Sequence, residues 1–260
     1  MAYQLGAFNR PWNQFEYEEA LAGISGAGFK YTGLMRQGGE ILLDSSTPTD
    51  EVENLRGTVE EAGLQMNTVL GRLDFADGVD GAIADLEQLL QNCAAIGASY
   101  FLNCGTKDED LRQDYYTVLR EGAEIGKDLG VTVTLKPHGG ITTTGDDLLQ
   151  AAETVNHDNF GIYYDAGNMV HYGSHDPVEA AKACAQYVVG MCVKDSLGQG
   201  IGVNILPGEG EVDFEGVMSA LAAGGFIDGP LLIECLGGET IEEVNTNALA
   251  TRKFLEYLVG

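Results

Sequence analysis

The sequence is short of basic residues. Its 260 residues contain 14 Lys and Arg against 40 Asp and Glu, which gives a formal net charge of −26. The acids are spread along the chain rather than collected in one tail, and this indicates a folded domain with an acidic coat. Because such a coat repels phosphate backbones, we expect no nucleic-acid partner. Concentrated salt screens self-repulsion of this kind, so our hypothesis is a halophilic, salt-adapted protein.

Long apolar runs and paired cysteines are also missing. No stretch of about 18 or more apolar residues occurs, so we expect no membrane span. The N-terminal residues MAYQLGAFNRPW lack the basic patch and apolar run of a signal peptide, and we therefore expect a cytoplasmic location. The five cysteines form no CxxC pair, which predicts free thiols in a reducing compartment and no zinc finger.

What the sequence does contain is one unit repeated eight times, a short apolar run followed by a helical pattern. Alternating strands and helices predict a parallel sheet with right-handed crossovers, and eight units in about 250 residues predict one (β/α)8 TIM barrel domain over residues 1–260. The alternative, an open doubly wound sheet, is disfavoured because no GxGxxG follows a strand. The first strand should include Leu5 and the last Ile233. The expected strands are 3–8, 31–35, 65–71, 99–105, 131–137, 160–168, 188–196 and 229–238.

Several helix boundaries can be read directly from the sequence. Glycine at Gly97 and Gly130 is typical of a helix C-cap followed by a strand. Asp176 before Pro177 predicts a helix start, and Thr240 with Glu243 three residues later predicts a capping box.

Polar side chains lie where the predicted strands end. In a (β/α)8 barrel the active site lies at the carboxyl ends of the strands, and Lys136, Asp165 and Glu234 all fall there. Side chains alternate along a strand, so Lys136 and His138 share a face. We expect Lys136, Asp165 and Glu234 to converge at one mouth of the barrel, with His138 and Lys194 in the same cleft.

Some of these residues have a structural interpretation beside the functional one. Asp165 could form an Asx turn with Gly167 and Asn168. Glu234 lies inside the apolar run PLLIECL, where a buried charge needs a partner, so we favour function. Cys192 is more often an inert core thiol than a ligand or nucleophile.

Four segments together resemble a known family. They are YYDAGNMVHYGSHDP (163–177), CVKDS (192–196), PGEGEVDFEGV (207–217) and LLIEC (231–235). The combination is similar to the xylose isomerase-like, sugar phosphate isomerase/epimerase barrels. The resemblance implies an isomerase or epimerase of carbohydrate metabolism. Its substrate would be a small keto sugar, polyol or sugar derivative, and its reaction would abstract a proton next to a carbonyl.

The same resemblance implies one divalent metal between a Glu, an Asp, a His and a Glu on strands five to eight. Asp165 and Glu234 match this set, but Lys136 stands in place of the first Glu and Cys192 in place of the His. Two alternatives remain open. The ammonium of Lys136 could replace the metal and neutralise the carboxylates, because a protonated lysine cannot be a ligand. Otherwise His138, Asp165 and Glu234 could form a shifted site for Mn, Zn, Mg or Fe.

The resemblance also suggests roles for individual residues. Glu234 and Asp165 would be the acid/base pair, Lys136 would stabilise the enediolate, and His138 would relay a proton. The residues expected to shape the substrate pocket are Arg10, Trp12, Arg36, Asn168, Lys194 and Asn204.

Two other functions stay open. One is a dehydratase or lyase acting on a keto sugar or keto-inositol. The other is an inactive barrel that serves as a binding or assembly protein, and a homo-oligomer is left open in every case. A repair endonuclease is excluded, because it needs many histidines and a basic face and this chain has four histidines.

Overall fold

The eight strands close into a barrel. The computed structural model describes residues 3–173 and 175–260. Every pair of sequential strands is parallel, and the eighth strand pairs with the first, so the order is β1 to β8 around a closed ring. The strands are β1 (Tyr3–Phe8), β2 (Tyr31–Leu34), β3 (Gln65–Leu70), β4 (Tyr100–Asn103), β5 (Thr132–Leu135), β6 (Phe160–Asp165), β7 (Val188–Val193) and β8 (Gly229–Ile233). The predicted TIM barrel is confirmed, and Leu5 and Ile233 lie in the first and last strands.

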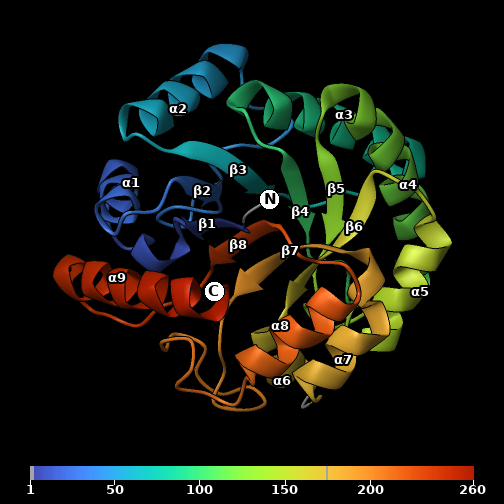
Figure 1. Cartoon of the computed structure of the whole chain (residues 1–260). Coiled ribbons are helices and arrows are strands. Elements are labelled where there is room, and N and C mark those ends of the chain that lie inside the picture. The colour runs from blue at the N-terminus through green and yellow to red at the C-terminus, as the bar shows by residue number, and fades with distance from the viewer. Residues whose placement is uncertain (1–2, 174) are drawn as a thin grey trace.

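The helices surround the barrel, as Figure 1 shows. They are α1 (Tyr17–Gly26), α2 (Thr49–Glu61), α3 (Gly78–Ile96), α4 (Arg112–Leu129), α5 (Gly145–Val155), α6 (Ala166–Gly173), α7 (Pro177–Cys184), α8 (Phe214–Ala223) and α9 (Ile241–Leu258). Among the described helices, none is long and apolar enough to cross a membrane. The unit after β6 differs from our prediction, because the segment read as strand and loop folds into the extra helix α6.

The predicted helix boundaries form as their local chemistry requires. The Asp176 side chain accepts hydrogen bonds from the first turn of α7, and Thr240 and Glu243 form the capping box of α9. Gly97 and Gly130 follow α3 and α4 with φ of 92° and 72°, the left-handed region in which a side chain would be strained.

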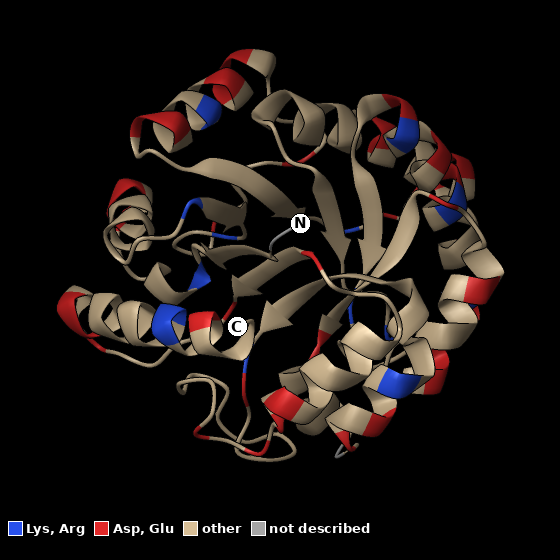
Figure 2. Ribbon diagram, viewed as in Figure 1, with Lys and Arg blue, Asp and Glu red and all other residues tan. Residues whose placement is uncertain are grey.

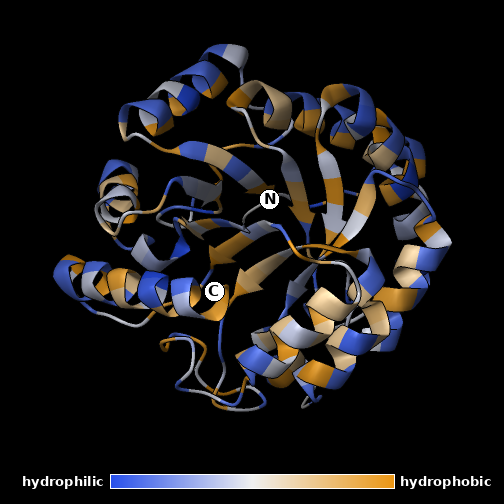
Figure 3. Cartoon of the chain, in the orientation of Figure 1, coloured by the Kyte–Doolittle hydropathy of each residue, from blue (hydrophilic) through white to orange (hydrophobic). Residues whose placement is uncertain are grey.

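The core has two layers, because strand side chains alternate between the barrel interior and the helices. The interior cluster consists of Phe8, Met35, Leu102, Tyr163, Cys192 and Leu232. A much larger cluster fills the space between the strands and the helices. In Figure 3 the helices are hydrophobic in patches and hydrophilic elsewhere, as expected for elements that pack one face on a barrel.

Acidic residues recur along the outer helices and outnumber the basic ones there, as the colouring of Figure 2 shows. Most ion pairs on this coat are local and exposed. Arg56 pairs with Glu60 one turn away on α2, and Lys182 pairs with Glu179 on α7. Pairs of this kind contribute little to stability, typically about 0–1 kcal/mol.

Candidate active site

Four charged side chains meet at the carboxyl ends of strands β5 to β8. We call Lys136, Asp165, Lys194 and Glu234 the charged quartet. Each lies two residues after a side chain that points into the barrel, as Lys194 does after Cys192 and Glu234 after Leu232. Strand alternation therefore turns all four into the barrel mouth. Their exposed fractions are between 0 and 5%, so the quartet is buried.

Each ammonium of the quartet contacts both carboxylates. Lys136 Nζ lies 3.0 Å from Asp165 Oδ2 and donates a short hydrogen bond to Glu234 Oε2. Lys194 Nζ lies 2.8 Å from Glu234 Oε1 and 3.3 Å from Asp165 Oδ2. Two cations and two anions give the quartet a formal charge of zero, which is what permits its burial.

Asp165 Oδ2 is close to both ammonium groups, but neither N–H is aimed at it. Among the described residues this atom accepts no well-directed hydrogen bond, although both lysines are within ion-pair distance. Its other oxygen accepts a hydrogen bond from the backbone of Asn168 at the start of α6. The carboxylate therefore retains one acceptor site that points into the quartet.

The quartet shifts the pKa of its own members. Burial alone would raise the pKa of Glu234, but Lys136, Lys194 and Arg10 outweigh it and hold the pKa well below its ordinary value. Burial would lower the pKa of Lys194, and the attraction of Asp165 and Glu234 raises it instead. Both groups are thus charged at neutral pH.

Lys136 is charged for the same reason. Burial opposes its charge, and the attraction of Glu234 and Asp165 raises its pKa well above the ordinary value. Burial also raises the pKa of Cys192 well above its usual range, so Cys192 is a neutral thiol. The carboxylates therefore provide the attraction that keeps Lys136 protonated.

A divalent metal does not fit beside this lysine. The donor atoms of Asp165, Cys192 and Glu234 lie within 4.8 Å of one another, the spacing of a metal site. Lys136 Nζ contacts both carboxylates and lies 3.7 Å from Cys192 Sγ, so the ammonium fills the space between the three ligands. A second cation there would be repelled by a charge that cannot move away without leaving its partners.

His138 lies at the edge of the quartet rather than in it. Its Nε2 is 3.0 Å from the hydroxyl of Tyr172, and among the described donor groups it belongs to no metal-like cluster. Burial lowers the pKa of His138 to about 4, assisted by repulsion from Lys136 and Lys194. The ring is partly exposed and neutral at pH 7, so the expected metal set of His138, Asp165 and Glu234 does not form.

The residues predicted to shape the substrate pocket separate into three groups. Arg10 is close to the quartet and donates to the Glu234 carbonyl at 3.3 Å and to Cys235 Sγ. Asn168 is buried, and its amide donates to the Pro137 carbonyl at 2.7 Å, which ties α6 to the end of β5.

Arg36 and Asn204 are exposed on the loops after β2 and β7. Trp12 does not line the mouth. It is 0% exposed in the outer core and donates its indole N–H to Asn245 on α9 at 2.7 Å.

Two features of the site were not predicted. Tyr172 lies on α6, the helix that the sequence did not indicate, so its contact with His138 had no local signal. Asp195 accepts hydrogen bonds from the backbone of Gly208, Gly210 and Val212 at 2.9–3.1 Å. The two residues of the Lys-Asp motif after β7 therefore have different roles. Lys194 belongs to the quartet, whereas Asp195 binds the backbone of the long loop before α8.

Comparison with known proteins agrees with the barrel. No curated protein matches this chain. Among solved structures, a xylose isomerase domain protein from Planctomyces limnophilus is 20% identical with a TM-score of 0.75, covering 99% of this chain and 98% of that chain. A D-psicose 3-epimerase from Clostridium cellulolyticum H10 is 15% identical with a TM-score of 0.75, covering 98% and 99%.

A third structure, the probable 3-DHS dehydratase AsbF from Bacillus anthracis, is 15% identical with a TM-score of 0.70, covering 98% of this chain and 99% of that chain. At these identities the likeness concerns the fold. The model of the family described as xylose isomerase-like TIM barrel matches residues 21–258, almost the whole chain, so this protein belongs to the xylose isomerase-like TIM barrel family.

Proposed function

We propose that this protein is an isomerase or epimerase of a small polyhydroxy ketone that works without a metal at the quartet. The observation that carries the proposal is the pair of buried ammonium groups, Lys136 and Lys194, held against Asp165 and Glu234 at the barrel mouth. Abstraction of a proton next to a carbonyl produces an enediolate. Fixed positive charge in a poorly solvated site is what stabilises that anion.

The quartet is difficult to explain as a stabilising feature. Replacing a buried ion cluster by well-packed apolar side chains is often neutral or stabilising, so four buried charges favour a functional role over a structural one. The same reasoning counts against an inactive barrel. A barrel used only for binding or assembly has no need to bury two lysines and two carboxylates at its mouth.

Glu234 is the proposed base, and its activation depends on the substrate. In the free protein its low pKa makes it a weak base, because both oxygens are bound by lysines. When the carbonyl oxygen of a substrate takes over an ammonium contact, Glu234 loses part of that stabilisation and its pKa rises. Neutral His138, hydrogen-bonded to Tyr172, is the residue that we propose to move a proton between the substrate oxygens.

Solvent exchange tests the reaction class before the substrate is known. The protein is incubated in D2O with ketopentoses, ketohexoses, their phosphates and their acids, with and without EDTA. Deuterium at the carbon next to the carbonyl is followed by NMR and mass spectrometry. We expect exchange with at least one compound, insensitive to EDTA and lost in Lys136→Met and Glu234→Gln.

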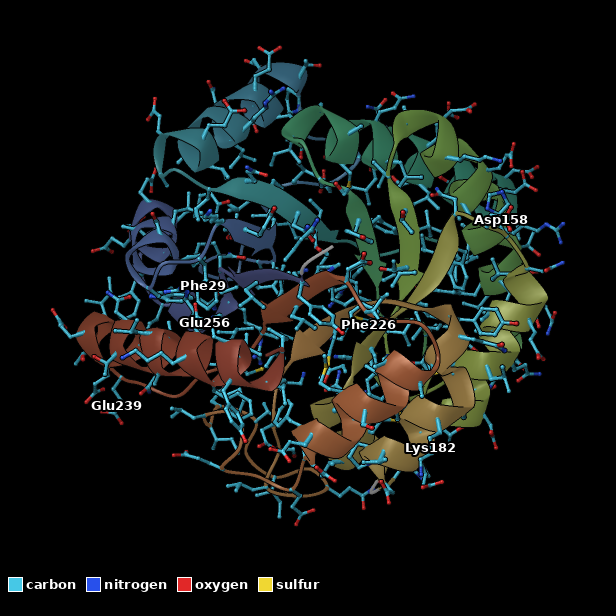
Figure 4. The ribbon with its side chains drawn as sticks, viewed as in Figure 1. Phe29, Asp158, Lys182, Phe226, Glu239 and Glu256 are labelled. Atoms are coloured by element: carbon cyan, nitrogen blue, oxygen red, sulfur yellow. The ribbon has the colours of Figure 1, made fainter. Side chains whose placement is uncertain are left out.

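Lys182→Met is the matched control. Lys182 lies at the outside of the barrel (Figure 4) with 57% of its side chain exposed, so this variant should retain wild-type exchange. Absence of exchange with every compound would favour the binding or assembly function. Exchange that EDTA abolishes and Mn²⁺ restores would contradict the metal-free site.

A dehydratase is the second candidate, and its support is the likeness to the probable 3-DHS dehydratase. Dehydration begins with the same proton abstraction and continues with loss of a hydroxyl group as water. Mass spectrometry of the products distinguishes the two reactions, since an epimer has the mass of its substrate and a dehydrated product does not.

A further inference from the structure

Basic residues gather at the barrel mouth of a chain that has few of them. Among the last residue of each strand and the three residues after it, five are basic and three, Asp165, Asp195 and Glu234, are acidic, whereas the whole chain has 14 basic and 40 acidic residues. The acidic coat and the basic mouth therefore have opposite charge, an arrangement that draws anions towards the mouth. The five basic residues are Arg10, Arg36, Arg72, Lys136 and Lys194.

Three of these five, Arg10, Arg36 and Arg72, form no ion pair with a carboxylate among the described residues, and Arg10 donates instead to the Glu234 carbonyl and Cys235 Sγ. The quartet neutralises Lys136 and Lys194, whereas Arg36 and Arg72 are exposed. Arg36 donates only to the carbonyl of Gly39 at 3.0 Å, and within residues 3–173 and 175–260 neither arginine forms an ion pair with a carboxylate. In a chain so rich in Asp and Glu, two unpaired guanidinium groups side by side require an explanation.

The two arginines line one cavity, of about 100 Å³, at the carboxyl ends of β2 and β3. Two carboxylates, Asp44 and Asp85, line it as well, and neither forms an ion pair with the two arginines among the described residues. Asp44 accepts hydrogen bonds from the backbone and hydroxyl of Ser46, and Asp85 accepts one from Ser45. The apolar wall is formed by Leu34, Leu43, Leu70 and Leu89. Guanidinium groups against an apolar wall are suited to an oxyanion, which they bind in bidentate fashion.

The usual place for an anion in this fold is blocked. Barrels of this type often bind phosphate at the loops after strands seven and eight. Here the carboxylate of Asp195 accepts the backbone N–H groups of Gly208, Gly210 and Val212 from that loop. These donors are not available to a ligand, whereas the guanidinium groups of Arg36 and Arg72 are exposed.

One residue of the cavity lining also packs in the barrel interior beside the quartet. Met35 lines the cavity and also packs in the interior cluster with Cys192, whose Sγ lies 3.7 Å from Lys136 Nζ. The arginines and the quartet lie at the carboxyl ends of strands of the same barrel, so a substrate that spans this face could contact both. Binding energy from such a remote group can position the reactive end of a substrate.

We infer that Arg36 and Arg72 form an anion subsite and that the substrate is a polyhydroxy ketone carrying a carboxylate or a phosphate. The reaction of this substrate rests on the proposed function, whereas binding of its anionic group does not. A carboxylate and a phosphate both present an oxyanion at the end of the substrate opposite the reacting carbonyl. Binding experiments can distinguish these two groups.

Calorimetric titration at one fixed KCl concentration tests the subsite. The probes are fructose, fructose 6-phosphate and fructuronate, which differ only at the carbon that carries the anion. The proteins are the wild type, the double variant Arg36→Gln/Arg72→Gln and the control Arg56→Gln, whose arginine is paired with Glu60 on α2. We expect one anionic probe to bind at least about tenfold more tightly than fructose, with that advantage lost in the double variant and kept in the control.

The probe that gains affinity identifies the group as carboxylate or phosphate. Equal affinity for fructose and both anions, anion affinity that survives in the double variant, or no binding of any probe would overturn the subsite. Arginine-dependent binding without deuterium exchange would leave the subsite standing and refute the reaction. Exchange of fructose 6-phosphate and fructuronate that the double variant does not change would leave the reaction standing and refute the subsite.

Discussion

The two sides of the barrel mouth carry positive charge in opposite ways. At the ends of β5 to β8, Lys136 and Lys194 are buried and each contacts two carboxylates. At the ends of β2 and β3, Arg36 and Arg72 are exposed and unpaired among the described residues. On one side the cations are paired with carboxylates before any ligand arrives, and on the other two exposed guanidinium groups form no ion pair with a described carboxylate. The first is suited to reacting groups and the second to binding.

The quartet should be the more sensitive of the two sides to the loss of a charge. Lys136→Met leaves Asp165 and Glu234 with one cation in a buried site, and removal of one partner from a buried pair typically costs about 3–5 kcal/mol. We expect a loss of this size in the free energy of unfolding, measured with denaturant. The control Lys182→Met removes an exposed pair and should cost less than about 1 kcal/mol.

A second substitution makes this test specific for charge. Lys136→Met/Glu234→Gln removes one cation and one anion together, so the site is again balanced. The double variant should be more stable than the sum of the two single changes predicts. Strict additivity would show that packing around Lys136, rather than its ammonium, stabilises the site.

The next test replaces the ammonium by a metal. Lys136→Glu/Cys192→His restores the ligand types that the family resemblance implies, beside Asp165 and Glu234. We expect Mn²⁺ to stabilise this variant by about 2.7 kcal/mol at one hundred times its dissociation constant, and to leave the wild type unchanged. The measurement is thermal unfolding over a series of Mn²⁺ concentrations. Stabilisation of the wild type by Mn²⁺ would contradict the view that Lys136 excludes the ion.

A pH series tests the neighbouring histidine. The pKa of His138 is about 4 in the folded protein, below the ordinary value of 6.5, because of burial and the two lysines. The unfolded chain therefore takes up the proton first as the pH falls, so stability is complete above about pH 6.5 and declines towards pH 4. His138→Gln should remove this part of the decline, with a smaller effect than Lys136→Met.

The fall in stability below about pH 4.5 has another origin. The pKa of Glu234 is depressed, so protonation of the unfolded carboxyl reduces stability only in that lower range. An unchanged decline between pH 6.5 and 4.5 in His138→Gln would refute the assignment to this ring.

The sequence predicted the parts of the site that depend on local periodicity. Alternation along β5, β6 and β8 was enough to turn Lys136, Asp165 and Glu234 towards one mouth, because the period of a strand does not depend on its neighbours. The same alternation of side chains along a strand predicted that Lys194 faces the mouth, but as a substrate-binding residue. Its ion pair with Asp165 depends on the adjacency of β6 and β7 in the barrel.

Other parts depend on packing between distant segments. Trp12 follows the first strand, where a substrate wall was reasonable, yet its ring is held in the core by Asn245, more than 200 residues away. The contact of Tyr172 with His138 requires α6, whose eight residues directly follow a strand. Contacts between segments far apart in the chain have no fixed sequence spacing, so the sequence could not show them.

The smallest expected effect is that of salt on the melting temperature. It distinguishes the exposed acidic residues from the buried quartet. Forty acids against 14 basic residues repel one another on the outside, and KCl screens exposed charges over distances of about 10 Å or less at 0.1 M and above. We expect the melting temperature of the wild type to rise with KCl, which is the test of salt adaptation. The quartet is at most 5% exposed, so ions cannot screen it from within. The slope of melting temperature against KCl concentration should therefore be the same in Lys136→Met as in the wild type, although the melting temperature of the variant is lower at every concentration. A wild-type melting temperature that does not rise with KCl would refute salt adaptation, and a much steeper slope in Lys136→Met would show that the quartet is open to solvent.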